Sequence, residues 1–360
     1  WTGRLVGTLA TLLAAAAIGW GVWRETRRAP VAALSGLAFV ASNYVYHIGP
    51  LFRQHMFMVM LETLAVVVLA GGSFSDSASR QPPAANNHSR LILGLALLLL
   101  AGYTKQLAVA TAAAIFCWLF VQNPRRAVLS GIAFAAAFIA VFFALNAATG
   151  GYWFRSTILA NINRTVPGQM AFLFRQWGWL HAVLLVAAAA RAVWETYFGR
   201  ISLYSGWFFF AVAIGAFSGK FGAGESYFVT AVAAACALSG IGFGRLLNRA
   251  KGHRPYPVLL FVIPLLYLLQ ARLVLHLPTR GPVFEPLARA LHLPLDAPYY
   301  DSQGYTQLGR PPDAADTAAG WRIAEIVRAS PRPAFSEEAA FPLAAGKPVI
   351  GNPFPLLVMY

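Results

Sequence analysis

An apolar run from Leu91 to Val121, interrupted only at residues 103–106, constrains this chain more than any other feature. As one straight helix it would be roughly 45 Å long at about 1.5 Å per residue, whereas a bilayer core is about 30 Å thick. The alternative is two helices, each about 21–23 Å long, that meet at the polar break. Lys105 and Gln106 would then form the floor of a polar cavity, because a lysine in hydrocarbon needs water or an anionic partner. A single long tilted helix with Lys105 reaching the interface is the other interpretation.

The rest of the chain has the same apolar character. Its 360 residues are 58% hydrophobic and 11% charged, and that charged fraction is less than half of the about 25% typical of soluble proteins. The apolar runs are continuous, which favours helices over alternating strands. The sequence therefore predicts an all-α polytopic membrane protein with about ten spans. These lie near Leu5–Trp23, Val31–Tyr46, Met56–Ala70, Leu91–Thr104, Leu107–Val121, Ala127–Ala147, Gly178–Trp194, Ile201–Ser218, Tyr227–Phe243 and Pro257–Val274.

The loops between these spans separate by charge. One alternate set, which includes residues 23–28 and 245–254, is basic and nearly free of acids, so the positive-inside rule makes it cytoplasmic. The formal charge of +15 therefore reports topology, and nucleic-acid binding is not indicated, because the basic residues are spread between apolar segments. The unusual polar residues all fall in the other, outer set: Arg53, His55, Lys105, Asn161, Asn163, Arg164, Lys220 and Glu225.

Two outer segments differ from simple helix connections. The loop at residues 149–177 interleaves aromatic side chains with arginines, as in an amphipathic segment at the lipid interface or an ordinary aromatic belt, and it contributes Asn163 and Arg164 as candidate substrate-binding residues. Residues 275–360 hold 7 basic and 8 acidic side chains, with one helix expected from Asp316 to Arg328 and strand-like pieces at 333–336 and 348–350. The prediction is a multi-helix membrane domain over residues 1–274 and a small extracytoplasmic α/β segment over residues 275–360.

A helix that starts near Arg53 carries the first group of candidate site residues. Arg53 is a permanent cation suited to phosphate, and His55 is either a base or a neutral hydrogen-bonding group. Glu62 shares a helical face with His55, about 10 Å deeper, and an acid within a span is a candidate for function. Both His55 and Glu62 are catalytic candidates, with satisfied structural side chains as the alternative for each.

The glycine-rich segment at residues 218–228 carries the second group. Lys220 offers a cation, Glu225 and Tyr227 offer substrate contacts, and the glycines allow close backbone approach, although a plain helix–helix turn would look similar. Arg53, Lys105, Gln106 and Lys220 thus become candidate ligands for a phosphate. A basic, partly buried outer site beside lipid suggests an anionic lipid head group, most simply a polyprenyl phosphate or diphosphate.

Taken together, these segments resemble bacterial polytopic glycosyltransferases of the GT-C class, in the family 39 and protein O-mannosyltransferase-like group. The resemblance rests on the helix start at residues 1–5, on 49–56, on Lys105-Gln106, on 220–228, and on the tail motifs at 336–338, 345–349 and 352–354. Many relatives have Arg-x-Asp where this chain has Arg53-Gln54-His55. The aspartate base that the resemblance implies belongs to an outer loop that would precede Trp1, so the sequence is expected to be a fragment.

The resemblance implies a transferase in the inner (plasma) membrane that works on the extracytoplasmic side. It would move a sugar from a polyprenyl-phosphate donor to a glycan, lipid or protein acceptor. The implied mechanism is direct displacement at the anomeric carbon, with cations at the leaving phosphate. No metal-ligand set is identified, and the need for a divalent metal is left open. One alternative function is a transporter or flippase for a lipid-linked or anionic solute, which would need polar residues reaching both faces. The other is a non-catalytic membrane scaffold, in which the outer turns would not converge in space.

Overall fold

The computed structural model describes residues 2–51, 53–71, 86–162, 164–274, 284–290, 292, 314–332 and 340–348. Within these residues the chain is all-α, with sixteen α-helices, four short 3-10 helices and no strand. An isolated antiparallel bridge joins Thr165 and Lys220. The predicted helical fold class is therefore confirmed. The strand-like pieces expected near the C-terminus lie outside the described residues, apart from Pro348, which belongs to no element.

The chain divides into two compact units. Unit 1 comprises Trp1–Val141 and Thr165–Leu275, and unit 2 comprises Phe142–Arg164 and His276–Tyr360. Unit 1 holds α1 (Thr2–Thr26), α2 (Ala29–Ala41), α3 (Asn43–Ile48), α4 (Gln54–Ala70), α5 (Asn86–Thr104), η1 (Gln106–Ala108), α6 (Val109–Gln122), most of α7 (Pro124–Ala148), α9 (Pro167–Leu180), α10 (Ala182–Phe198), α11 (Leu203–Ile214), η3 (Gly215–Gly219), η4 (Glu225–Phe228), α12 (Val229–Ala250) and α13 (Tyr256–Val274). Unit 2 holds the end of α7, α8 (Tyr152–Thr157), η2 (Leu159–Asn161), α14 (Phe284–Ala290), α15 (Ala314–Ala329) and α16 (Ala340–Ala344).

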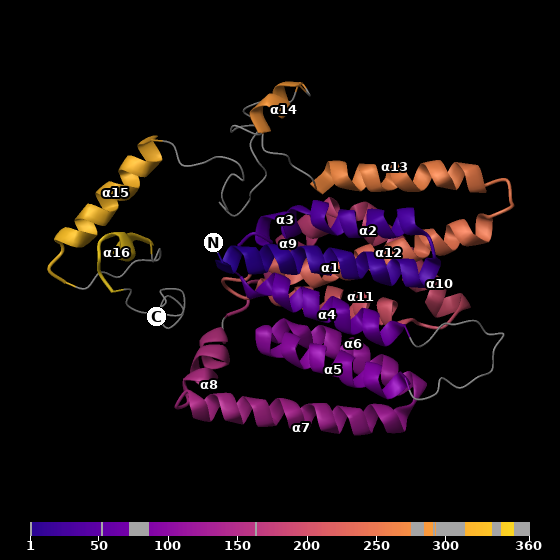
Figure 1. The fold of residues 1–360 in the computed structure, drawn as a ribbon, viewed down its shortest axis with the longest axis horizontal. Coiled ribbons are helices and arrows are strands. Elements are labelled where there is room, and N and C mark those ends of the chain that lie inside the picture. The colour runs from indigo at the N-terminus through magenta and orange to yellow at the C-terminus, as the bar shows by residue number, and fades with distance from the viewer. Residues whose placement is uncertain are drawn as a thin grey trace. The chain divides into compact units, whose positions relative to one another are not determined.

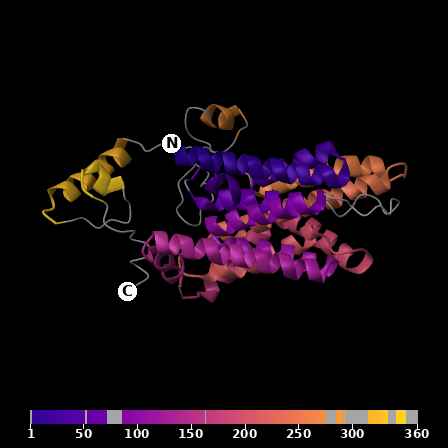
Figure 2. The same ribbon diagram turned by 60° about the horizontal axis from the view of Figure 1, so that its bottom comes forward.

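Unit 1 is a bundle in which most long helices lie side by side with their axes roughly parallel (Figures 1 and 2). The helix α12 lies in its interior, against α1, α2, α10 and α11, and is buried along most of its length. Small residues allow this close packing: a Cβ added at Gly240 of α12 would lie 2.1 Å from the Ser35 hydroxyl of α2. Membrane helices commonly associate through such small residues, because lipid gives no hydrophobic drive for helices to associate.

Four helical segments in the described residues are long and apolar enough to cross a membrane. They are α1, α7, the continuous η4–α12 segment and α13; the pair α9 and α10, bent by 90°, makes a fifth if it counts as one span. Five further apolar helices are shorter: Ala29–Ala41, Gln54–Ala70, His88–Thr104, Gln106–Gln122 and Leu203–Gly219. By length and hydropathy the chain has the helices of a multi-pass membrane protein, and the expectation of about ten spans stays a prediction.

The span predicted at Gly178–Trp194 is broken in the structure. The helix α9 ends at Leu180 and α10 begins at Ala182, with a bend of 90° between them. Gln270 of α13 stabilises the break, because its amide donates to the Leu180 carbonyl at 2.7 Å and accepts from the Leu184 N–H at 3.3 Å. Backbone groups freed at a helix break inside a bundle need such partners. A continuous helix was the wrong prediction here because the stabilising side chain comes from a distant part of the sequence.

Candidate anion-binding site

The polar break at residues 103–106 is the turn of a helical hairpin. The helix α5 ends at Thr104, Lys105 is extended with φ −160° and ψ 138°, and η1 then leads into α6. The helices α5 and α6 lie side by side, which rules out the single long helix (Figure 1). The first arm begins at Asn86 rather than Leu91, so it is about 28 Å long instead of the predicted 21 Å.

Lys105 lies beside two other predicted site residues. Its Nζ is 2.6 Å from Nε2 of His55, near the start of α4. The same nitrogen lies over the Tyr227 ring of η4, 5.6 Å from the ring centroid, as in a cation–π pair. His55 is buried, whereas Lys105 and Tyr227 are half-buried. Three segments that are far apart in the sequence therefore meet at one end of the bundle.

Positive charge accumulates around this contact. Arg53 precedes the first residue of α4, and Lys220 follows η3. Burial, and then the charges of Arg53 and Lys220, lower the pKa of Lys105 to about 8. Burial also lowers the pKa of Lys220. Partly desolvated cations that destabilise one another in this way favour an anionic ligand, because the anion offsets both their repulsion and their lost hydration.

Several buried polar atoms near the same helix ends lack a hydrogen-bond partner among the described residues. They are Asn43 Oδ1, His55 Nδ1, Trp177 Nε1 and Ser218 Oγ, in side chains that are 0–7% exposed. The elements that carry Asn43, Trp177 and Ser218, namely α3, α9 and η3, pack against η4, and Trp177 stacks on Phe228 with 4.9 Å between ring centroids. Buried polar groups in native proteins are nearly always hydrogen-bonded, so these atoms are candidates for contacts with a ligand or ordered water.

The glycine-rich turn after η3 is tied to α9. The amide nitrogen of Gln169 lies 2.7, 3.1 and 2.9 Å from the carbonyl oxygens of Ser218, Lys220 and Ala223. Val166 N–H also donates to the Gly219 carbonyl at 2.6 Å. Sequence reasoning did not identify Gln169 as a site residue. The sequence shows only a glutamine in place of an apolar residue; its contact with the turn that carries candidate site residues comes from the structure.

Glu62 lies deeper and is fully buried in a hydrogen-bond network that joins four helices. Its Oε1 accepts from the Thr111 hydroxyl of α6 at 2.7 Å, and its Oε2 accepts from the Thr230 hydroxyl of α12 at 2.8 Å. The Thr111 hydroxyl in turn accepts from the Trp207 indole N–H of α11 at 2.9 Å. Both carboxyl oxygens are engaged, which favours the structural alternative for Glu62 over a direct catalytic role.

The remaining predicted residues vary in how they are placed. Gln106 is exposed at the start of η1, and Glu225 is half-buried as the first residue of η4. Asn163 lies outside the described residues, while Arg164 is an exposed residue of unit 2. The structure therefore brings together His55, Lys105 and Tyr227 by direct contact, and Arg53 and Lys220 by their electrostatic effect on Lys105.

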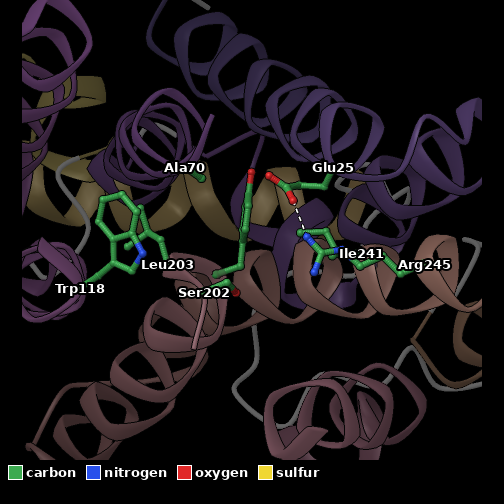
Figure 3. A pocket seen from close by; sticks show the side chains of 8 residues that line it. Glu25, Ala70, Trp118, Ser202, Leu203, Ile241 and Arg245 are labelled. Atoms are coloured by element: carbon green, nitrogen blue, oxygen red, sulfur yellow. Dashed lines mark hydrogen bonds and ion pairs between the residues drawn. The ribbon is translucent and has the colours of Figure 1, made fainter. Parts of the chain in front are cut away.

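A second polar cluster lies at the opposite helix ends. Glu195 of α10 is 2% exposed and accepts from Arg191 at 2.6 Å, from the Ser205 hydroxyl at 2.6 Å and from the Ser202 N–H at 2.9 Å. Arg245 of α12 lies 3.9 Å from Glu195 and pairs with Glu25 of α1 at 2.6 Å. Figure 3 shows this ion pair beside a small pocket that Trp118 and Leu203 also line. These charges pair with one another, so the cluster connects helices and offers little free charge to a ligand.

The described residues contain no group of three or more His, Cys, Asp or Glu side chains that could hold a metal ion. Comparison of the chain with protein-family models, with curated proteins and with solved structures finds no match.

Proposed function

We propose that this chain is a membrane glycosyltransferase that uses a polyprenyl-phosphate sugar as donor. The observation that carries the proposal is the contact between Lys105 and His55, 2.6 Å long, with Arg53 and Lys220 close enough to lower the pKa of the lysine. Lys105 comes from a turn and Tyr227 from the 3-10 helix η4, at one end of a bundle of apolar helices. A phosphate carried on a long lipid matches this combination of cations and apolar surroundings.

In the proposed reaction an acceptor hydroxyl oxygen attacks the anomeric carbon of the sugar. The bond from that carbon to the phosphate oxygen breaks, and its electron pair leaves with the polyprenyl phosphate. Arg53, Lys105 and Lys220 stabilise the negative charge on that leaving phosphate. The hydroxyl proton passes to a base, a role for which the resemblance implies an aspartate. Glu62 is too enclosed to take this role directly.

The proposal places the site on the extracytoplasmic side of the inner membrane, with about ten spans and the basic loops in the cytoplasm. The opposite helix ends carry Arg245, Arg249 and Lys251, which supports this orientation. The acceptor is a glycan, a lipid or a protein.

The test is a transfer assay with membranes that contain the full-length protein and a panel of radiolabelled polyprenyl-phosphate sugars. Label should move to an acceptor in the wild type, and Lys105→Ala should lose transfer. Lys251→Ala is the matched control, because it removes an exposed lysine from the opposite helix ends and should leave transfer unchanged. Binding of polyprenyl phosphate without transfer from any donor would contradict the proposal and favour the flippase.

A further inference from the structure

The contact between Lys105 and His55 fixes the hydrogen-bonding role of each ring nitrogen. An ammonium group has three N–H donors and no acceptor, so Nε2 of His55 must accept from it across the 2.6 Å contact. A doubly protonated ring would place an N–H against the ammonium and add a positive charge beside Lys105 and Arg53. The ring is therefore neutral, and its proton is on Nδ1.

The other ring nitrogen, Nδ1, is a donor in need of an acceptor. Its solvent-accessible surface is nearly zero, and it has no hydrogen-bond partner among the described residues. The whole side chain is 6% exposed, so bulk water does not satisfy it. A buried donor left without an acceptor is costly, and one held at a fixed place beside cations is suited to an anionic oxygen.

We propose that His55 binds the ligand as a neutral hydrogen-bond donor, through Nδ1–H, to an oxygen of the phosphate that the three cations attract. The identity of that phosphate rests on the proposed function. Lys105 then has two tasks: it supplies charge to the phosphate, and it holds the tautomer that exposes a donor at Nδ1. His55 is accordingly a binding residue and not the base for the acceptor hydroxyl, because Nε2 is already engaged.

Two substitutions separate the ring nitrogens. The amide of asparagine lies two bonds from Cβ, as Nδ1 does, so His55→Asn keeps a donor there and loses the acceptor for Lys105. The amide of glutamine lies three bonds from Cβ, as Nε2 does, so His55→Gln keeps the acceptor and loses the Nδ1 donor. The probe is a short-chain polyprenyl monophosphate without sugar, and its binding to the purified full chain in detergent is measured directly.

We expect His55→Gln to weaken binding of this probe about ten- to hundredfold, as for the loss of a hydrogen bond to a charged group. We expect His55→Asn to stay within about threefold of the wild type. Equal binding by His55→Gln and wild type, or an equal loss in both variants, would overturn the inference while leaving the proposed function standing. No binding by the wild type would overturn both. Probe binding with this mutant pattern, but no sugar transfer, would support the histidine's role and reject the transferase.

A second measurement needs no mutant binding data. Nitrogen-15 NMR of histidine-labelled wild-type protein distinguishes the Nδ1–H tautomer from the Nε2–H tautomer, and the His55 signal is the one that His55→Asn removes. We expect the Nδ1–H tautomer in the wild type and a shift toward the Nε2–H form in Lys105→Met. An Nε2–H ring in the wild type at neutral pH would overturn the inference.

Discussion

The network around Glu62 allows a prediction of stability in which the variants differ by a single hydrogen bond. Thr230→Val removes one interhelical bond, from Thr230 to Glu62. Thr111→Val removes two, because the Thr111 hydroxyl donates to Glu62 and accepts from the Trp207 indole. Valine keeps the shape of threonine, so both changes delete the hydroxyl with little change in packed volume.

The expected magnitudes follow from the number of bonds lost. Interhelical hydrogen bonds in membrane bundles contribute about 0.6 kcal/mol on average and at most about 1.7 kcal/mol. Thr230→Val should therefore lower the free energy of unfolding by about 0.6–1.7 kcal/mol. Thr111→Val should cost about twice as much, since it also leaves the Trp207 indole N–H buried without an acceptor.

The assay is equilibrium unfolding in mixed micelles, with tryptophan fluorescence as the signal. Thr63→Val is the matched control. Thr63 is fully buried next to Glu62 in sequence, but among the described residues its hydroxyl bonds only to the Val59 carbonyl of its own helix. We expect the order of destabilisation Thr111→Val, then Thr230→Val, then Thr63→Val. A loss in Thr230→Val that equals or exceeds that in Thr111→Val would refute the reasoning, as would an equal loss in the control.

Three further predictions follow from other parts of the structure. Binding of the polyprenyl monophosphate probe should weaken as the pH rises through about 8. Burial and two neighbouring cations lower the pKa of Lys105 to that value, so the lysine loses its charge there. Lys105→Arg should lose less binding over the same range, because arginine keeps its charge and Lys220 is then the remaining site lysine whose pKa burial lowers; a flat wild-type profile, or an equal loss in the variant, would count against the site. Gly240→Ala should destabilise by about 1–3 kcal/mol because its Cβ would overlap a serine hydroxyl of α2, whereas Gly178→Ala, with nothing within 4 Å, should be neutral or stabilising in the same unfolding assay. Glu195→Ala should lower the free energy of unfolding by about 3–5 kcal/mol, because it leaves the buried Arg191 without its partner. Glu285→Ala, in an exposed pair, should lower it by at most about 1 kcal/mol. Similar losses in both variants would show that burial of the first pair is unimportant.

Much of the helical pattern follows from the sequence, since each predicted span corresponds to one or two helices in the structure. The runs at Leu5–Trp23 and Pro257–Val274 lie within α1 and α13. Hydropathy does not show where a helix breaks, however. The bend at His181 depends on Gln270, which is 86 residues from the Leu184 N–H that it accepts. The amino-acid composition around the bend therefore does not indicate that Gln270 is the partner.

The candidate site, like the helical pattern, follows from the sequence only in part. Arg53, Lys105 and Lys220 stand out in the sequence because cations beside apolar runs need a reason to be there. Their proximity depends on the packing register of separate helices, which pattern alone does not give. Glu195 illustrates a different error. The predicted spans place it in a cytoplasmic loop, whereas the structure buries it in α10. Its charge is tolerated there because Arg191 pairs with it and Ser202 and Ser205 donate to it.

Because the Gln169 amide contacts three carbonyls of the glycine-rich turn, the turn and the first part of α9 form one rigid body. Displacing the turn alone would break the contacts of that amide with Ser218, Lys220 and Ala223 at once, along with the bond from Val166 to Gly219. Moving the turn together with α9 preserves all of them. A displacement of the turn at Lys220 would therefore need the slower tilting of a helix rather than the rapid fluctuation of a loop.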